Sequence, residues 1–137
     1  MTIFFPLNNK YPPFNHFYLI NPIILSDVIK NFCNKNNISL KFPNDIFVNK
    51  KKICGILQEI ITSKSSKFLI IGIGININSS PKLKKTYLST SIFKETKEKP
   101  NIKKVINLII SSYEIFFSNL KKYNYLEYKK KAQEMAL

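Results

Sequence analysis

The chain has 137 residues, enough for one domain that buries a core without disulfides or metal ions. It carries 22 lysines, no arginine and 8 acidic residues, for a formal net charge of +14. Arginine is the residue that forks onto phosphates and reads base edges, so this charge argues against specific nucleic-acid binding. No apolar run approaches the roughly 18 residues of a membrane span, and the first residues lack the basic start of a signal peptide. We therefore expect a cytoplasmic protein without a membrane partner.

The two cysteines, Cys33 and Cys54, stand in apolar surroundings, with no second Cys or His at the spacing of metal ligands. This pattern argues against a zinc site or a redox pair. We expect two buried thiols in a reducing compartment.

The N-terminal part combines a strand with a helix. The apolar run Ile3–Leu7 predicts a short strand, and the Asn- and Pro-rich residues 8–16 predict a loop. Apolar residues recur at three- and four-residue spacing over Pro22–Cys33, which predicts an amphipathic helix that ends at Asn36 and Asn37.

The middle of the chain reads as a series of strands. The alternating runs Ile38–Phe42, Ile46–Val48 and Ile53–Ile61 follow one another closely, which implies antiparallel neighbours. A polar turn over Thr62–Lys67 leads to the nearly continuous apolar run Phe68–Ile77. A strand that is apolar on both sides is expected in the interior of its sheet.

The C-terminal part is mainly helical. The lysine-rich residues Ser79–Lys99 predict a surface connection with one short helical turn near Leu88. Three- and four-residue spacing from Ile102 to Leu120 predicts a long helix with Pro100 near its first turn, and Tyr125–Ala136 predicts a last helix beside it. These elements indicate an α/β (α+β) fold, in which helices pack on a mixed, mainly antiparallel sheet.

One acid and one lysine flank a predicted hairpin. The run Lys-Phe-Pro-Asn-Asp ends at Asp45, and after six residues the run Lys-Ile-Cys-Gly-Ile-Leu-Gln-Glu begins at Lys52. The Pro-Asn pair bends the backbone, so we expect the two charges to face each other across the hairpin. Such a pair suits chemistry on a carboxylate and a phosphate. Strand alternation places Gly55 on the opposite face from Lys52, which shares its face with alternate residues: Cys54, Ile56, Gln58 and Ile60.

All three glycines of the chain, Gly55, Gly72 and Gly74, fall inside predicted strands. Glycine weakens a strand unless a backbone or ligand approaches closely, so we expect either bulges or space for a ligand. The segment 72–78 lacks the third glycine and the following helix of a dinucleotide-binding loop. The amide of Asn76 is suited to a purine edge, or else it ends the strand.

Together these runs resemble the catalytic core of biotin-protein ligases. Lys-Phe-Pro-Asn-Asp, Lys-x-x-Gly-Ile-Leu-x-Glu and Gly-Ile-Gly-Ile-Asn-Ile-Asn stand in the order and at the spacing of that family. Ser89–Ile92 and Tyr125–Tyr128 also look like its downstream pattern, so the resemblance covers essentially the whole chain. It implies the fold that biotin ligases share with class II aminoacyl-tRNA synthetases.

The resemblance implies a reaction with ATP, biotin and Mg²⁺. Biotin and ATP would form biotinyl-adenylate and pyrophosphate, and the adenylate would acylate a lysine of a biotin carboxyl carrier protein. Lys52 would contact the biotin carboxylate and the adenylate phosphate. Asp45 and Asn44 would lie beside the reacting centre, where Asp45 orients the carrier lysine or holds Mg²⁺. The alternative for these two residues is a turn that caps its own backbone.

The resemblance also assigns residues to ligand binding. Gly55, Gly72 and Gly74 would leave room for the ligand, and Asn76 would meet the adenine. Phe42 replaces the tryptophan that is usual in the family.

The glycine- and arginine-rich loop that the family has upstream of the first strand has no counterpart here. We therefore expect residues 1–137 to form a partial catalytic domain, incomplete at the N-terminus. It would have no N-terminal DNA-binding domain and no C-terminal small β domain.

Three other interpretations stay open. The chain is a non-catalytic remnant or one half of a split ligase, which self-associates or needs a partner chain to complete its sheet. It is a lipoate-attaching relative, whose fold and turn lysine are similar. Or it is a lysine-rich nucleic-acid-binding module, which predicts salt-dependent binding to any duplex.

Overall fold

The computed structural model describes residues 1–33, 38–81 and 88–137. Its centre is a five-stranded sheet in the order β1-β5-β4-β3-β2. The strands are β1 (Thr2–Pro6), β2 (Ile38–Lys41), β3 (Asp45–Val48), β4 (Lys51–Ser63) and β5 (Ser66–Ile75). All four strand pairings are antiparallel, and within the described ranges parallel contact is limited to two single bridges, Leu40 with Ala136 and Lys52 with Ser89. The predicted fold class is confirmed.

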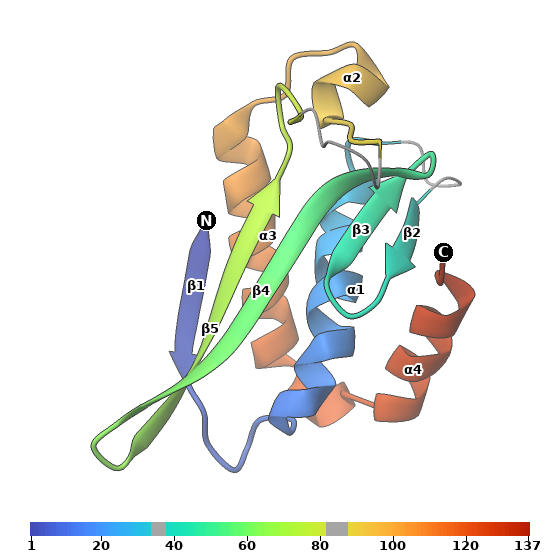
Figure 1. Cartoon of the computed structure of the whole chain (residues 1–137). Coiled ribbons are helices and arrows are strands. Elements are labelled where there is room, and N and C mark those ends of the chain that lie inside the picture. Colours follow the sequence, from blue (N-terminus) through green and yellow to red (C-terminus); the bar gives the residue numbers. More distant parts are fainter. Residues whose placement is uncertain (34–37, 82–87) are drawn as a thin grey trace.

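The helices gather on one face of this sheet (Figure 1). They are α1 (Phe17–Lys30), α2 (Ile92–Thr96), α3 (Ile102–Ser118) and α4 (Tyr125–Glu134), with 3₁₀ turns at Phe14–His16 and Leu120–Lys122. α1 packs against α3, α4 and the strands β2 and β3. Among the described residues, no helix covers the opposite face, which we call the open face, and α2 lies above the end of the sheet where β3 and β4 meet (Figure 1).

Strand alternation divides β5 between the two faces. Leu69, Ile71 and Ile73 are buried in the core, whereas the residues between them are half-buried or exposed. β5 pairs with β1 on one side and β4 on the other, so the prediction that this strand is interior is confirmed. Because each strand residue turns its side chain to the face opposite its neighbour's, Gly72 and Gly74 lie on the open face.

Two helix predictions need correction. α1 begins at Phe17 and not at Pro22, which lies inside the helix. Phe17 and Ile20 are fully buried, so packing adds a helical turn at a site where proline alone indicates a start. α1 ends at Lys30, and the predicted stop at Asn36 and Asn37 lies outside the described residues.

The short helical turn lies at α2 and not near Leu88. Ser91 begins α2 as its N-cap, since its side chain accepts a hydrogen bond from the Lys94 N–H. Leu88 lies outside the helix, and its carbonyl accepts a hydrogen bond from a backbone N–H of β4. The prediction was wrong because the segment around Leu88 forms backbone hydrogen bonds with β4 in place of a helical turn.

Candidate functional site

Asp45 and Lys52 form an ion pair where β3 and β4 meet. Lys52 Nζ lies 2.6 Å from Asp45 Oδ1, and the side chains are 29% and 15% exposed. Among the described residues, no hydrogen-bond donor of good geometry reaches that carboxylate oxygen. Asn49 and Lys50, which connect the two strands, have φ of 51° and 62°, as a two-residue type I′ hairpin requires. The predicted pairing of the two charges across a hairpin is therefore confirmed, but the turn between them is Asn49–Lys50, since the Pro-Asn bend lies before β3 and joins it to β2.

A β-bulge next to Lys52 changes the register of β4. Phe47 lies opposite Lys52, but the preceding residue Ile46 lies opposite Cys54, so Ile53 is an extra residue in β4. One extra residue reverses the alternation of faces on either side of it. A residue before the bulge therefore does not share its face with the residue two positions later. It shares its face with the residue three positions later.

The bulge places Lys52 on the same face as Gly55. A Cβ atom added to Gly55 would lie 3.6 Å from Lys52 Nζ and 3.8 Å from Asp45 Oδ1. The prediction that Lys52 shares its face with Cys54 and Ile56 is wrong, since both are buried in the core beneath the sheet. The ammonium group lies on the open face, beside a position that has no side chain.

The three glycines form a floor next to this pair. Gly55 lies opposite Gly74, and Gly72 lies opposite Leu57 on the same open face. No glycine has a positive φ, so their backbone conformation does not require glycine. The irregularity of the sheet is at Ile53 and not at a glycine, so the bulge interpretation of these residues is not supported. What the glycines provide is a surface on which a flat ligand can approach the backbone.

Asn76 links the end of β5 to the segment that follows. Its Nδ2 donates to the Thr90 carbonyl at 2.9 Å, and its backbone carbonyl accepts from the Ile92 N–H at 3.0 Å. The amide nitrogen is therefore already engaged within the protein. Asn44 is exposed at the turn before β3, and its carbonyl accepts from the Ile56 N–H at 2.8 Å. The peptide bond between Phe42 and Pro43 in this turn is cis.

Both cysteines are buried, as predicted. Cys54 is 1% exposed, and burial, followed by the negative charge of Asp45, raises the pKa of its thiol to about 12. Cys33 is 5% exposed, and burial together with the charge of Glu95 raises its thiol pKa to about 11. Burial and the raised pKa both argue against a nucleophilic role for either thiol.

A network around Glu95 was not predicted from the sequence. The Glu95 carboxylate accepts from Asn49 Nδ2 at 2.6 Å and from the Thr90 hydroxyl, and Lys51 Nζ lies 3.7 Å away. Burial alone would raise the pKa of Glu95, but these hydrogen bonds and the lysine charge outweigh it and lower the pKa. Ser91 is a recognisable N-cap signal for α2, but nothing in the sequence indicates where Glu95 points.

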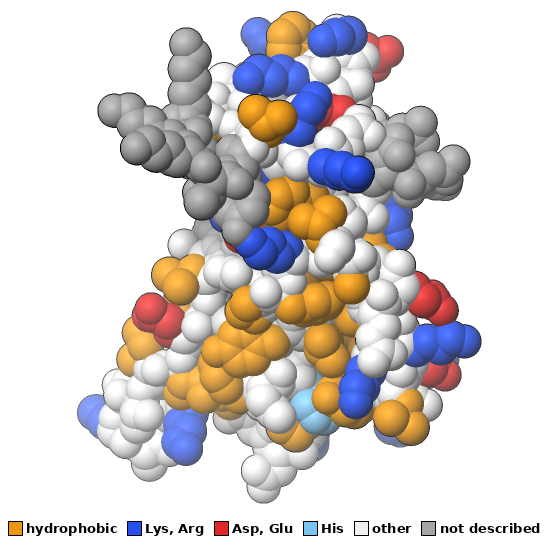
Figure 2. All heavy atoms as spheres, turned by 45° about the vertical axis from the view of Figure 1, so that its right-hand side comes forward, with side chains coloured by type: hydrophobic (Ala, Val, Ile, Leu, Met, Phe, Trp, Pro, Cys, Tyr) orange, Lys and Arg blue, Asp and Glu red, His pale blue; other side chains and the backbone are white. Residues whose placement is uncertain are grey.

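Beyond the glycines, the open face carries several exposed apolar side chains, with the charged Glu59 among them. Phe4, Leu57 and Ile61 are 70%, 63% and 46% exposed and continue the surface beyond the glycines. In Figure 2, which also brings the side of α4 forward, apolar side chains gather in the lower half of the visible surface, and lysines lie at the end that carries α2 and along the lower edges. A hollow of about 470 Å³ lies between β1 and α3, lined among others by Ile3, Phe5, Ile110, Tyr113 and Phe117.

Neither a metal site nor a membrane-spanning helix is found among the described residues. No three His, Cys, Asp or Glu side chains lie close enough together there to hold a metal ion. None of the helices there is both long and apolar enough to cross a membrane.

The fold and the site point to a class of ligases. A protein-family model described as the Biotin/lipoate A/B protein ligase family matches residues 5–76, just over half of the chain, and includes Asp45, Lys52 and all three glycines. The chain belongs to this family. The resemblance to biotin-protein ligases that the sequence motifs indicate is confirmed.

Particular relatives agree with this assignment. Biotin–protein ligase 2 of Arabidopsis thaliana is 30% identical over 105 residues, which cover 69% of this chain and 30% of the relative. The bifunctional ligase/repressor BirA of Bacillus subtilis (strain 168) is 49% identical over 43 residues, 31% of this chain and 13% of the relative. The chain therefore spans less than a third of the length of either protein.

Solved structures share the fold. The biotin protein ligase from Aquifex aeolicus in complex with biotin and ATP superposes with a TM-score of 0.77 at 25% identity, over 99% of this chain and 57% of that one. The Leishmania major enzyme in complex with biotinyl-5-AMP gives a TM-score of 0.78 at 20% identity, over 99% of this chain and 60% of that one. Nearly all of this chain therefore corresponds to somewhat more than half of a biotin protein ligase.

Proposed function

We propose that this chain takes part in the ATP-dependent attachment of biotin to a lysine of a biotin carboxyl carrier protein, through biotinyl-adenylate. The observation that carries the proposal is the ion pair of Asp45 and Lys52 beside a floor of three glycines, in a chain of the biotin and lipoate ligase family. The related structures from Aquifex aeolicus and Leishmania major bind biotin with ATP and biotinyl-5-AMP. Residues 1–137 would form part of a catalytic domain, and ATP dependence with buried thiols favours the cytoplasm.

In the first step, an oxygen of the biotin carboxylate attacks the α-phosphorus of ATP. A bond forms between that oxygen and the phosphorus, the bond to pyrophosphate breaks, and pyrophosphate leaves. The Lys52 ammonium would contact both reacting groups and stabilise the negative charge that develops on the phosphate. Lysine suits this role because its charge is compact and its stem is flexible. Asp45, 2.6 Å away, would hold the ammonium toward the open face until the substrates arrive.

In the second step, the amine of the carrier lysine attacks the acyl carbon and adenosine monophosphate leaves. Asp45 would orient that amine from its place beside the reacting centre, with Asn44 at the exposed turn next to it. Gly55, Gly72 and Gly74 would let the planar parts of the adenylate lie against the sheet. Asn76 would meet the adenine with its Oδ1, since its Nδ2 already binds the Thr90 carbonyl.

Mg²⁺ would have little support from these residues. Asp45 is the one carboxylate at the pair, its oxygen already lies against Lys52, and the described chain gathers no set of three metal-ligand side chains. Mg²⁺ does bind phosphates with only one or two carboxylates, and in that case the nucleotide supplies most of its ligands. No step proposed above depends on the metal.

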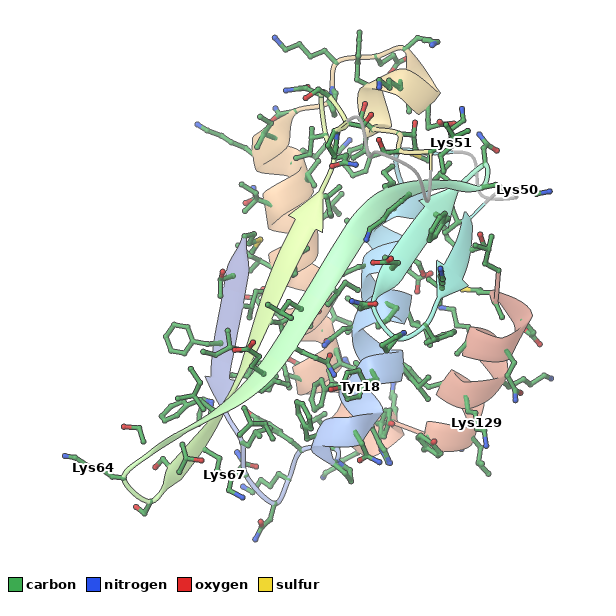
Figure 3. All side chains as sticks on the ribbon, viewed as in Figure 1. Tyr18, Lys50, Lys51, Lys64, Lys67 and Lys129 are labelled. Atoms are coloured by element: carbon green, nitrogen blue, oxygen red, sulfur yellow. The ribbon has the colours of Figure 1, made fainter. Side chains whose placement is uncertain are left out.

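Exchange of labelled pyrophosphate into ATP, measured with and without biotin, tests the first step. We expect biotin-dependent exchange in the purified chain and a loss of at least about 100-fold in Lys52→Ala, because a preorganised charge at a phosphate supplies about that much. The matched control is Lys67→Ala, an exposed lysine at the far end of the sheet from Lys50 and Lys51 (Figure 3).

The outcomes separate the interpretations. Exchange that survives in Lys52→Ala as well as in Lys67→Ala would overturn the role of Lys52. Exchange with lipoate in place of biotin would identify a lipoate-attaching relative. Absence of exchange in the unaltered chain would favour the non-catalytic interpretation.

A second candidate, a chain that needs a complementing strand, is favoured by the outer edge of β1. Met1 and Leu7 bond to β5, and alternation then turns the backbone groups of Thr2, Phe4 and Pro6 away from the sheet. No other strand of the described chain pairs with this edge. Phe4→Pro removes one outward donor without affecting the bonds to β5. If sedimentation shows self-association in the unaltered chain and not in Phe4→Pro, a strand does bind this edge.

A further inference from the structure

Lys52 is held by hydrogen bonds from a segment on the far side of β4. Its N–H donates to the Leu88 carbonyl at 2.8 Å, and its carbonyl accepts from the Thr90 N–H at 2.9 Å. On its other side Lys52 lies opposite Phe47 of β3. The position of the Lys52 backbone therefore depends on the segment Leu88–Thr90 as well as on the hairpin.

That segment is not part of a strand, so other contacts must hold it. The Thr90 carbonyl accepts from Asn76 Nδ2, and the Thr90 hydroxyl donates to Glu95 Oε1. The other oxygen of Glu95, Oε2, accepts from Asn49 Nδ2 at 2.6 Å. Glu95 thus ties Leu88–Thr90 to the β3–β4 turn, and these are the two pieces of chain that flank Lys52.

The surroundings of Glu95 require a carboxylate. Its side chain is only 10% exposed, and both Thr90 and Asn49 present hydrogen-bond donors to it. Lys51 Nζ adds a positive charge at 3.7 Å. A glutamine would turn its own N–H groups toward one of these donors and keep one acceptor where the carboxylate has two.

From this geometry we infer that Glu95 is a positioning residue for Lys52. It fixes the backbone on both sides of the lysine and so keeps the ammonium at the place where charge develops on the phosphate. Figure 1 shows α2, which carries Glu95, directly above the end of the sheet where β3 and β4 meet. The inference rests on the proposed function for its chemistry, but the contacts of Lys52 can be tested without any substrate.

The test is amide hydrogen exchange in the unaltered chain, in Glu95→Gln and in Glu98→Gln. Glu98 is an exposed glutamate just beyond α2 and is the matched control. We expect the Lys52 and Thr90 amides to exchange about tenfold faster in Glu95→Gln, the effect of losing one hydrogen bond to a charged group. The Ile71 amide, in the interior of the sheet, should stay unchanged and so exclude global unfolding.

Two results of this experiment would overturn the inference. One is a Lys52 amide that exchanges at the same rate in Glu95→Gln as in the unaltered chain. The other is acceleration of the Lys52, Thr90 and Ile71 amides by the same factor, which would mean that Glu95 contributes only to overall stability.

Pyrophosphate exchange adds a second readout. We expect Glu95→Gln to lower turnover roughly tenfold or more while it changes the Michaelis constant for ATP much less, because a small displacement of a reacting group affects mainly the chemical step. Thr90→Val should reproduce much of this loss, and Thr90→Ser, which keeps the hydroxyl, should restore activity. If the unaltered chain shows no exchange, the proposed function fails, and the amide rates still decide whether Glu95 positions Lys52.

Discussion

Gly55 of β4 and Gly74 of β5 lie directly opposite each other on the open face of the sheet. Neither has a positive φ, so an alanine in either place would be better for the strand by about 0.5–1 kcal/mol. A Cβ added to Gly74 would meet its nearest neighbour, the Gly55 carbonyl, at an ordinary 3.7 Å. The fold therefore does not require glycine at these positions, and the ligand that we propose to lie against them would account for their presence.

The first prediction concerns Gly74→Val. Valine suits a strand, and its Cβ would meet the Gly55 carbonyl at an ordinary 3.7 Å, so we expect a melting temperature equal to or above that of the unaltered chain. Its methyl groups would fill the floor, so biotin-dependent pyrophosphate exchange should fall by at least about tenfold, the effect of about 1.4 kcal/mol. Thr2→Val, on the same face at the edge of the sheet, is the control. Unchanged exchange in Gly74→Val would show that no ligand occupies the floor.

Most of the fold could be predicted from periodicity. The strands and the two long helices depend on which residues face the core. The spacing of apolar residues reports this, as the alternating buried residues Leu69, Ile71 and Ile73 show. The start of α1 could not be predicted, because buried Phe17 and Ile20 extend the helix past Pro22. Proline marks a helix start only where packing does not decide otherwise.

The site could be predicted in its residues but not in its geometry. The Pro-Asn pair and the apolar alternation that begins at Lys52 indicate a hairpin that brings Asp45 and Lys52 together, although its two-residue turn is known only from the structure. The bulge at Ile53 depends on which hydrogen bonds form between β3 and β4, and periodicity does not report these. The contacts of Glu95 could not be predicted from the sequence, because its partners Asn49 and Thr90 come together only in the folded chain.

The second prediction concerns the β3–β4 turn, where Lys50 has φ of 62°. Left-handed backbone costs a non-glycine residue roughly 1–2 kcal/mol, so Lys50→Gly should raise the free energy of unfolding by about 1 kcal/mol. Urea denaturation measures this change. Lys67→Gly, in β5, should instead lower the free energy of unfolding, because glycine weakens a strand. Equal effects of the two substitutions would contradict the type I′ turn.

The third prediction concerns pH. The pKa of Glu95 is lowered in the folded chain, so the unfolded chain binds its proton more tightly. The stabilisation by the Glu95 carboxylate is therefore complete above the ordinary glutamate pKa of about 4.3 and is lost as the pH falls through the lower folded pKa. Thermal unfolding across this acidic range should show a smaller loss of stability in Glu95→Gln than in Glu98→Gln. Identical pH profiles of the two variants would contradict the network around Glu95.

The last prediction concerns the coupling of Asp45 and Lys52. Lys52→Met leaves a mostly buried carboxylate without its cation, and no other donor of good geometry reaches its oxygen within the described residues. We expect a loss of about 1–3 kcal/mol in the free energy of unfolding, and a similar or smaller loss in Asp45→Asn. The double variant should lose less than the sum of the two, with a coupling energy of about 1 kcal/mol, because neither charge is then left alone. Lys67→Met controls for the loss of a lysine, and strict additivity would show that the pair forms no stabilising contact in solution.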